Sequence, residues 1–594
     1  MTEKALQSIF LERWHPYAWI ALASCLLYGH VLTFSDYTYY DDYVLIARNF
    51  SHIDELSDIS HEFFEDTFHQ AQGGNFWRPI LTITFILSAQ ISGLDLWGYH
   101  LTDIVLHLMA SMLVFGALKS LGIRRGPAFV CSLLFCLHPS LTQAVAWISG
   151  RNDSLLAVFI LPCIIFFVKF LESPSVKWYL LHVLFFAFSM LTKESAIVLP
   201  LLALYYAAVV KKQNLYSLST ALLLLGWGMV LLNWQISRGI AQMGPLGDKW
   251  FAVKTVFSHL PVLFLYLGKI FWPFDLAFAP VQADVNFIPG IATILLLATA
   301  IVLAKTRNWR MITFGVLWFV LFLVPTFFHH IGITHPPKFY EHRIYLSFIG
   351  IMMIPLSLSF AGRFAPSRIF SYTSVTLAMV VLGVLSYNHS FNFKNCFTLS
   401  EFAARTSPSD ATQYPRVQMM HVPEDLIRQF LARQTRTSSV DLASTFQASS
   451  FSTQEIRSLL KETEQAKLSR PDDPTLHHGL AVLYFARGYY VRSLEEFQMA
   501  ATEEPENADL QFNLGVLCYE GHALGMAEQA WLKALQLDPL MAEAHQDLCY
   551  LFYEQKQYEK ASAHAQEASR LGLPVTPGLA AEVQKFLRPS GRQQ

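Results

Sequence analysis

Small groups of acidic and basic residues interrupt an otherwise apolar sequence, and chemistry could occur at these places. Asp41 and Asp42 stand among tyrosines, directly after an apolar stretch. A carboxylate just outside a membrane could act as a general base on a hydroxyl or could hold a metal. An acidic pair of this kind could equally cap the N-terminus of a helix. The dipeptide alone leaves these alternatives open.

Two other groups combine a cation with an expected helix end. Arg78 precedes Pro79 in the segment 74–79, and Lys193-Glu194 interrupts an apolar hairpin. Arg78 could clamp a phosphate or extend its side chain to lipid headgroups. Lys193 and Glu194 could form an ion pair at the turn, or could bind a lipid phosphate.

Histidine and arginine mark the remaining groups. His138 could simply end an apolar span, and Arg151 and Asp153 could pair with each other across a turn. Glu341-His342-Arg343 enters an apolar stretch, and imidazole with guanidinium at membrane depth suits an anionic headgroup. Three histidines precede this triplet: His329, His330 and His335. A zinc site built from them lacks a recognised spacing.

The elements that position these residues are predicted to lie in a bilayer. The chain has 594 residues, 53% hydrophobic and only 15% charged, against about 25% charged in soluble proteins. Its mean hydropathy is +0.34. The net charge of -2 gives no reason to expect a nucleic-acid partner, and the seven cysteines form no CxxC pair. We interpret the cysteines as small core residues.

Apolar stretches long enough for a membrane helix recur until about residue 388. The expected spans are 17–35, 100–118, 127–146, 153–171, 178–192, 195–210, 215–234, 289–305, 311–328, 344–361 and 369–387. Two further stretches, 79–94 and 256–273, are ambiguous. If both lie at the interface, every basic cluster between spans falls on the cytoplasmic side, as the positive-inside rule requires. This topology puts the N-terminus inside and the C-terminus outside.

A repeat with a period of 34 residues follows the spans. Three registers carry it: Pro471, Pro505 and Pro539; Leu480, Leu514 and Leu548; Ala500, Ala534 and Ala568. This is the period of tetratricopeptide (TPR) units, each a pair of helices. The small residues let the paired helices approach closely, and the concave face of such an array usually binds a peptide or protein.

The predicted fold is therefore all-α, with a polytopic membrane domain of about eleven spans followed by an α-solenoid. We place the membrane domain at 1–390, a linker with a degenerate TPR unit at 391–470, and TPR repeats with a C-terminal capping helix at 471–588. Within the linker, 396–415 holds the degenerate unit and 436–453 is rich in Ser and Thr.

As an ordered set, these motifs resemble the transmembrane-and-TPR family of O-mannosyltransferases, of the GT-C glycosyltransferase superfamily and its bacterial relatives. The resemblance runs through Tyr40-Asp41-Asp42, Trp77-Arg78-Pro79, Tyr99-His100-Leu101, 138–145, 150–156, Thr192-Lys193-Glu194, Tyr266-Leu267 with Trp272-Pro273, and 341–346. That family transfers a sugar from a polyprenyl-phosphate carrier to protein hydroxyls on the outer side of the membrane.

The resemblance implies a role for each candidate. Asp42 or Asp41 would be the catalytic base. The substrate-binding set would be Arg78, His138, Arg151, Asp153, Lys193, Glu194, Glu341, His342 and Arg343. Within it, Arg78, Lys193, His342 and Arg343 would hold the carrier phosphate, while Glu341 and Asp153 would orient the site.

Further expectations concern donor, partner and place. The donor would be a lipid-linked hexose such as mannose, no cofactor is certain, and a divalent metal stays open. The TPR units would bind the protein acceptor outside the cytoplasm, in the periplasm of a bacterium or, alternatively, in the endoplasmic reticulum lumen. The competing hypothesis is a non-catalytic TPR scaffold anchored in the membrane. A mere anchor, however, needs neither eleven spans nor charged residues gathered in several external loops.

Overall fold

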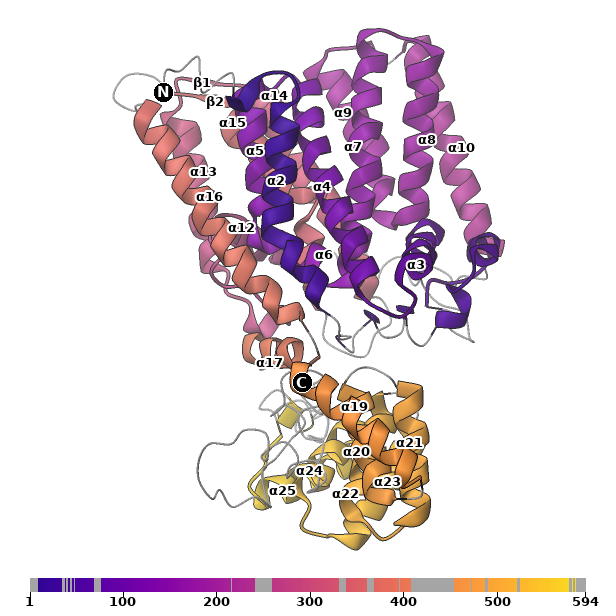
Figure 1. The fold of residues 1–594 in the computed structure, drawn as a ribbon. Helices are drawn as coiled ribbons and strands as arrows, with labels where there is room; N and C mark the ends of the chain where they lie inside the picture. The colour runs from indigo at the N-terminus through magenta and orange to yellow at the C-terminus, as the bar shows by residue number, and fades with distance from the viewer. Residues whose placement is uncertain are drawn as a thin grey trace, which may run out of the picture. The chain divides into compact units, whose positions relative to one another are not determined.

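The computed structural model divides the chain into two compact units, a membrane unit and a repeat unit (Figure 1). It describes residues 9–34, 38, 41–42, 45–46, 49–68, 76–214, 216–240, 259–330, 338–360, 368–394, 396–407, 453–471, 473–486, 490–520, 524–575, 579–580 and 583. The membrane unit comprises residues 1–35 and 44–394, and the repeat unit comprises 36–43 and 395–594.

The membrane unit is a bundle of helices. Its α-helices are α2 (His15–Tyr28), α3 (Pro79–Ser92), α4 (Trp97–Ser120), α5 (Arg125–Leu137), α6 (Gln143–Ala146), α7 (Arg151–Glu172), α8 (Val176–Thr192), α9 (Leu199–Tyr205), α10 (Leu218–Ile240), α12 (Val262–Phe271), α13 (Ile288–Leu303), α14 (Trp309–Leu323), α15 (Ser347–Leu356) and α16 (Arg368–Ser390). Two short strands, β1 (Thr306–Arg307) and β2 (Leu358–Ser359), pair antiparallel.

The helices agree with a multi-pass membrane protein. Among the described residues, six helices are long and apolar enough to cross a bilayer, and α5 with the segment Pro139–Ala146 forms a seventh candidate that bends by 59°. The other four expected spans coincide with shorter apolar helices of the described chain. The ambiguous stretches are also helical, as α3 and α12, each too short to cross alone.

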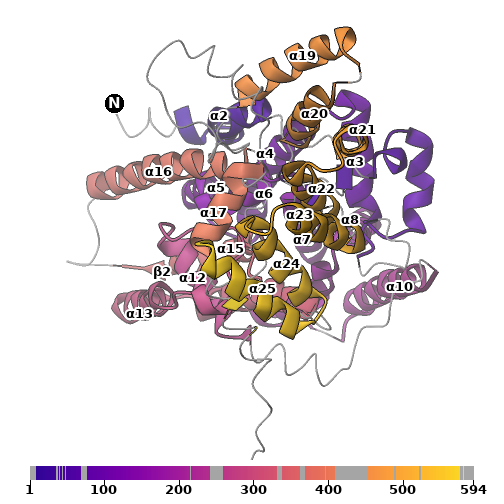
Figure 2. The same ribbon diagram turned by 90° about the horizontal axis from the view of Figure 1, so that it is seen from below.

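Side-chain size decides how closely neighbouring helices pack. At the α14–α15 crossing, a Cβ on Gly350 would come within 2.5 Å of the carbonyl oxygen of Gly315. Only glycine permits this approach, which fixes the two helices as a tight pair. At the periphery, α10 and α13 lie at opposite edges of the bundle (Figures 1 and 2). They expose large apolar side chains such as Leu232 and Leu295, as lipid-facing helices do.

The described part of the repeat unit is made of α-helices. They are α17 (Cys396–Thr406), α19 (Thr453–Ser469), α20 (Pro474–Ala486), α21 (Tyr490–Glu503), α22 (Ala508–Glu520), α23 (Leu524–Leu537), α24 (Ala542–Glu554) and α25 (Tyr558–Arg570). The 34-residue register predicts the pairs α20–α21, α22–α23 and α24–α25. The alanines at its third register, Ala500, Ala534 and Ala568, are all fully buried.

Two details differ from or extend the expectation. Helix α19 packs against α20, although its residues belong to the segment predicted as linker. Its apolar residues Leu459 and Leu460 are buried, which explains why the helix forms. The Ser/Thr-rich stretch and most of the expected capping helix lie outside the described residues.

Candidate active site

A buried ion pair links the N-terminus of α7 to the end of α8. Lys193, which caps α8, points its Nζ at Asp153 Oδ2 (2.7 Å) and at Asn152 Oδ1 (2.8 Å). Burial lowers the pKa of the Lys193 ammonium, and the Asp153 carboxylate opposes that shift. Asp153 also lies in the first turn of α7, where the helix dipole favours negative charge. The Asp153 carboxylate is therefore stabilised both by the Lys193 ammonium and by the dipole of α7.

The neighbour of Lys193 points elsewhere. Glu194 accepts two hydrogen bonds from Arg78, from Nε at 3.3 Å and from Nη2 at 2.9 Å. Arg78 stands immediately before α3, and its guanidinium lies 4.7 Å from the Phe76 ring centroid. The expected ion pair between Lys193 and Glu194 is thus wrong. The backbone turn sends the two side chains to different helices, and each finds a partner distant in sequence.

Glu341 is the centre of a second buried charge cluster. Its Oε1 accepts from Lys269 Nζ (2.6 Å) and from the backbone amide of Ala277 (2.7 Å). Its Oε2 lies 3.2 Å from His389 Nε2. Burial alone raises the pKa of Glu341, but Lys269 and His389 outweigh burial and hold that pKa below its usual value. The carboxylate is therefore ionised, and both oxygens are engaged within the protein.

His342 and Arg343 follow Glu341 in the same short helical turn, Glu341–Ile344. The backbone amide of His342 donates to Gln143 Oε1 (2.9 Å), and its Nε2 lies 3.7 Å from Asp153 Oδ2. Arg343 donates to the carbonyl oxygen of Lys338 (3.0 Å). This turn therefore joins the Glu341 cluster to the Lys193–Asp153 pair.

Positive charge exceeds negative charge in this network. Its cations are Arg78, Lys193, Lys269 and Arg343, and its carboxylates are Glu194, Asp153 and Glu341. Arg343 is 8% exposed and packs on the Tyr340 ring, 5.2 Å from its centroid. Within the residues that the structure describes, no carboxylate forms an ion pair with Arg343. A buried guanidinium without a carboxylate favours an anionic ligand, because burying an uncompensated charge is costly.

Arg151 has a structural environment. It forms an ion pair with Asp103 on α4, and both side chains are fully buried. It also donates to the carbonyl oxygens of Tyr99 (2.8 Å) and Thr84 (3.2 Å). The expected pairing of Arg151 with Asp153 is therefore wrong, because the helical start of α7 directs Arg151 into the bundle and Asp153 toward Lys193.

His138 likewise has intramolecular partners for both ring nitrogens. Nε2 lies 2.9 Å from the carbonyl oxygen of Ile270, and Nδ1 accepts from the Ser140 amide at 3.3 Å. The residue follows the last turn of α5, as the span-ending interpretation requires. These contacts favour a structural role over substrate binding.

Asp41 and Asp42 fall in residues 36–43, which group with the repeat unit. Asp42 is 2% exposed and accepts a hydrogen bond from Thr38 Oγ1 at 2.6 Å, whereas Asp41 is exposed. The structure thus brings the predicted phosphate-binding residues together in one unit and assigns the acidic pair to the other.

Sequence reasoning missed several residues that contact the predicted site residues. They are Asp103, Gln143, Asn152, Lys269 and His389. A signal was present for some of them: Asp103 and Lys269 are charged residues within apolar stretches, and such residues are functional candidates by default. Their partners could not be found, because the pairs join segments far apart in sequence.

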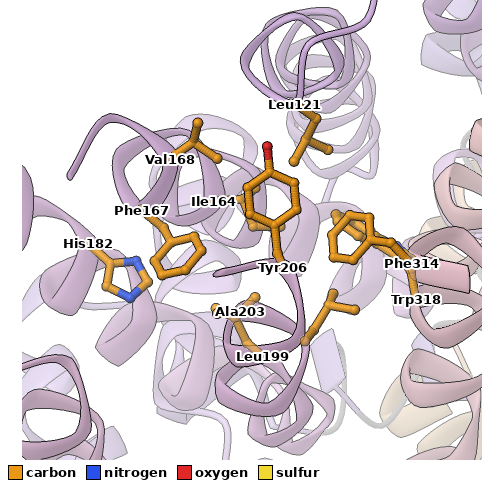
Figure 3. A pocket seen from close by; sticks show the side chains of 11 residues that line it. Leu121, Ile164, Phe167, Val168, His182, Leu199, Ala203, Tyr206, Phe314 and Trp318 are labelled. Carbon is orange, nitrogen blue, oxygen red and sulfur yellow. The ribbon is translucent and has the colours of Figure 1, made fainter. Parts of the chain in front are cut away.

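Apolar spaces lie within the described part of the bundle. The first, lined by residues such as Phe167, His182 and Tyr206, is only about 10 Å³, room for no more than a water (Figure 3). His182 Nε2 there accepts from the Trp227 indole at 2.8 Å. The second is a groove of about 340 Å³ enclosed by α12, α13, α14 and α15, and it is lined only by apolar residues, among them Leu267, Leu297 and Ile351.

Metal ligands are not gathered in the described part of the chain. No three His, Cys, Asp or Glu side chains there are grouped so that they could hold a metal ion. Of the three histidines before Glu341, His335 lies outside the described residues, and the side chains of His329 and His330 are not described either.

Part of the membrane unit is similar to proteins of known family. The family model described as dolichyl-phosphate-mannose-protein mannosyltransferase matches residues 79–234. That match begins at the residue after Arg78. It contains helix α3 and the residues Arg151, Asp153, Lys193 and Glu194. The chain resembles protein mannosyltransferases. The resemblance seen in the sequence motifs is therefore confirmed.

Individual relatives agree with the family model. Protein O-mannosyl-transferase tmtc2 of Xenopus laevis is 30% identical over 217 residues, which cover 33% of this chain and 26% of that protein. Protein O-mannosyl-transferase TMTC1 of Homo sapiens is 29% identical over 160 residues, covering 26% and 17%. Protein O-mannosyl-transferase F38B6.6 of Caenorhabditis elegans is 32% identical over 145 residues, covering 24% and 20%. The chain thus spans about a quarter or less of these relatives.

Solved structures give weaker matches. ArnT from Cupriavidus metallidurans, bound to undecaprenyl phosphate, aligns over 83% of this chain and 79% of its own, with 14% identity and a TM-score of 0.36. MamA from Desulfovibrio magneticus RS-1 (residues 41-end) aligns over 35% of this chain and 96% of its own, with 16% identity and a TM-score of 0.20.

Proposed function

We propose that the protein is a membrane glycosyltransferase that moves a sugar from a polyprenyl-phosphate carrier to Ser or Thr hydroxyls of a protein acceptor outside the cytoplasm. The observation that carries the proposal is Arg343, a buried guanidinium without a carboxylate ion-pair partner among the described residues. Its guanidinium sits in a network with a surplus of positive charge. A lipid phosphate is the anion that such a site at a membrane surface would take.

The transfer needs a base and a stabilised leaving group. Asp42 would take the proton of the acceptor hydroxyl while the hydroxyl oxygen attacks the anomeric carbon of the sugar. The bond from that carbon to the phosphate oxygen breaks, and the carrier leaves as a polyprenyl phosphate. Arg343 and Lys193 would stabilise the negative charge that grows on this phosphate. Asp153 would hold Lys193 and His342 in place.

The apolar groove would hold the carrier chain. Leu267 on its wall lies two residues before Lys269, and Ile351 lies two helical turns after Arg343. The groove therefore extends along α12, which ends at the charged network, and along α15, which begins just after it. A polyprenyl phosphate has this combination of an anionic head and a long apolar chain, so we assign the groove to the chain.

The repeat unit would bind the protein acceptor. Paired helices with the TPR period form arrays whose role is to bind peptides, not to perform chemistry. The alternative function is a non-catalytic scaffold, in which the repeats bind proteins and the membrane unit serves only as an anchor. That alternative gives no reason for a buried, positively charged network in the membrane unit.

The test measures sugar transfer by the full-length protein in lipid nanodiscs, with a polyprenyl-phosphate hexose and a Ser/Thr peptide. Arg343→Met is expected to lower kcat/KM for the donor by about a hundredfold or more, since charged contacts to a phosphate are strong. Arg310→Met, at an exposed arginine on the predicted cytoplasmic side, is the control and should change little. Equal transfer by the wild-type protein and Arg343→Met would reject the proposed role of this site.

A further inference from the structure

Both carboxylate oxygens of Glu341 are engaged by protein groups, so this side chain is not placed to contact the donor directly. It is 0% exposed, and its two oxygens are engaged by Lys269, Ala277 and His389. Lys269 is itself held by the carbonyl oxygen of Asp275 (2.8 Å). These partners come from three separate parts of the membrane unit: α12, the loop after it, and the end of α16.

The turn that Glu341 anchors also carries Arg343, the residue proposed to bind the carrier phosphate. Arg343 lies two positions further on, and the backbone amide of His342 is fixed by Gln143. A turn of four residues has few hydrogen bonds of its own, so its orientation depends on such outside contacts. Gln143 is in turn fixed, since its Nε2 donates to the carbonyl oxygen of Phe278 at 3.0 Å.

We infer that Lys269 and His389 are positioning residues for the phosphate site. They contact the Glu341 carboxylate from two helices, α12 and α16, and thereby fix the orientation of the turn that carries Arg343. Asn392 supports this arrangement, because its amide nitrogen lies 3.0 Å from His389 Nδ1 and leaves Nε2 to face Glu341. This inference rests on the proposed function, in that Arg343 is taken to bind the carrier phosphate.

Positioning has a signature that a general loss of stability lacks. If Lys269 acts through Arg343, its removal matters only while Arg343 is present. A double-mutant cycle measures this dependence directly, because independent effects multiply and coupled ones do not. The readout is the Kd of sugar-free undecaprenyl phosphate for the full-length protein in nanodiscs, which requires no transfer reaction.

Lys269→Met is expected to raise that Kd about tenfold in the wild-type background, since it leaves the buried Glu341 carboxylate without its ammonium partner and so loosens the turn. In the Arg343→Met background the same change should alter Kd less than about twofold. Lys269→Arg should restore binding to within about threefold, because it keeps a positive charge beside the buried Glu341 carboxylate. In transfer assays the donor KM should rise while kcat changes little.

Lys211→Met provides a matched control, since Lys211 pairs with Glu172 in a loop on the predicted cytoplasmic side. It should leave Kd unchanged. If Lys269→Met accumulates poorly, His389→Leu tests the same idea, because it removes one contact and leaves the Lys269–Glu341 pair intact.

Equal effects of Lys269→Met with and without Arg343 would overturn the inference. So would unchanged binding in both Lys269→Met and His389→Leu. Failure of the proposed function looks different: the wild-type protein would then transfer no sugar, while the binding cycle would still report whether Lys269 acts through Arg343.

Discussion

Two ion pairs at the membrane-unit site are buried more deeply than Arg470–Asp473 of the repeat unit. In the membrane unit, the pairs Lys269–Glu341 and Lys193–Asp153 are almost completely buried, with side chains 4% and 0% exposed in the first and 4% and 7% in the second. In the repeat unit, pairs such as Arg470–Asp473 stand at the surface, with side chains 60% and 23% exposed. Buried charges cost far more to keep than exposed ones. Stability alone does not explain their retention in the membrane unit, which points to a functional site there.

The repeat unit is instead held together by shape. Trp531 is fully buried, and a Cβ on Gly515 would lie 2.4 Å from its ring. The alanines at the 34-residue register are also fully buried. Substitutions at the membrane-unit site should therefore reduce ligand binding or catalysis. Substitutions in the core of the repeat unit should reduce its stability.

The largest expected effect separates catalysis from folding most clearly. Asp42→Asn should lower sugar transfer by about 10²–10⁴-fold, the usual contribution of a general base. Expression and membrane insertion should persist, since Asn can still accept the hydrogen bond from Thr38. Transfer rates in purified membranes measure the effect. Asp41→Asn, at the exposed neighbour, is the companion variant, and a larger loss there would move the base to Asp41.

A core substitution should break the repeat unit alone. Trp531→Ala removes a buried indole that also donates to the carbonyl oxygen of Phe512 (3.2 Å). Such a truncation costs about 3–5 kcal/mol. Limited proteolysis of the full-length protein should then cleave residues 453–575 faster, while binding of undecaprenyl phosphate stays normal. Loss of phosphate binding in this variant would show that the membrane-unit site depends on the repeat fold.

A smaller effect tests the groove. Leu297→Trp would fill part of the space between α13 and its neighbours, whereas Leu296→Trp places the same side chain at an exposed position on the same helix. Leu297→Trp should raise the donor KM about tenfold for long-chain carriers, because apolar contact area is lost. Carriers of one or two isoprene units should show no difference. Equal behaviour of the two variants would exclude the groove as the chain site.

The smallest effect concerns pH and the repeat unit. His545 and His564 approach each other, with 3.0 Å between their Nδ1 atoms. Burial, with help from His545 and Lys560, lowers the pKa of His564 to about 4, although Glu567 opposes the shift. Because the folded state prefers the neutral ring, this contribution to stability is present above about pH 6.5 and is lost as the pH falls toward 4.

The midpoint of thermal unfolding of the repeat unit should therefore drop by a few degrees between pH 7 and pH 5, after discounting for partial exposure. His564→Phe should remove most of that dependence. An unchanged pH dependence in the variant would assign it to other groups.

The fold was largely predictable from the sequence, because apolar length and a fixed period are local signals. All eleven expected spans coincide with helices, although four are shorter than a full crossing. The 34-residue register likewise locates the three helix pairs of the repeat unit. Helix α19 escaped prediction, since a single amphipathic helix has no repeat to reveal it.

The site was only partly predictable. Motif residues such as Lys193 and Arg343 were found, but their partners were not. Glu341 and His389 are 48 residues apart, and Lys269 is 72 residues from Glu341. Helix packing determines which charged residues form ion pairs, and no local sequence pattern predicts these pairings.

Mass spectrometry of exported proteins tests the central claim most directly. Cells with the wild-type chain, without it, and with Asp42→Asn would be compared under the same expression. The account predicts one hexose on defined Ser or Thr sites in the first case, and its absence in the other two. Identical glycosylation in all three would contradict a sugar-transfer function.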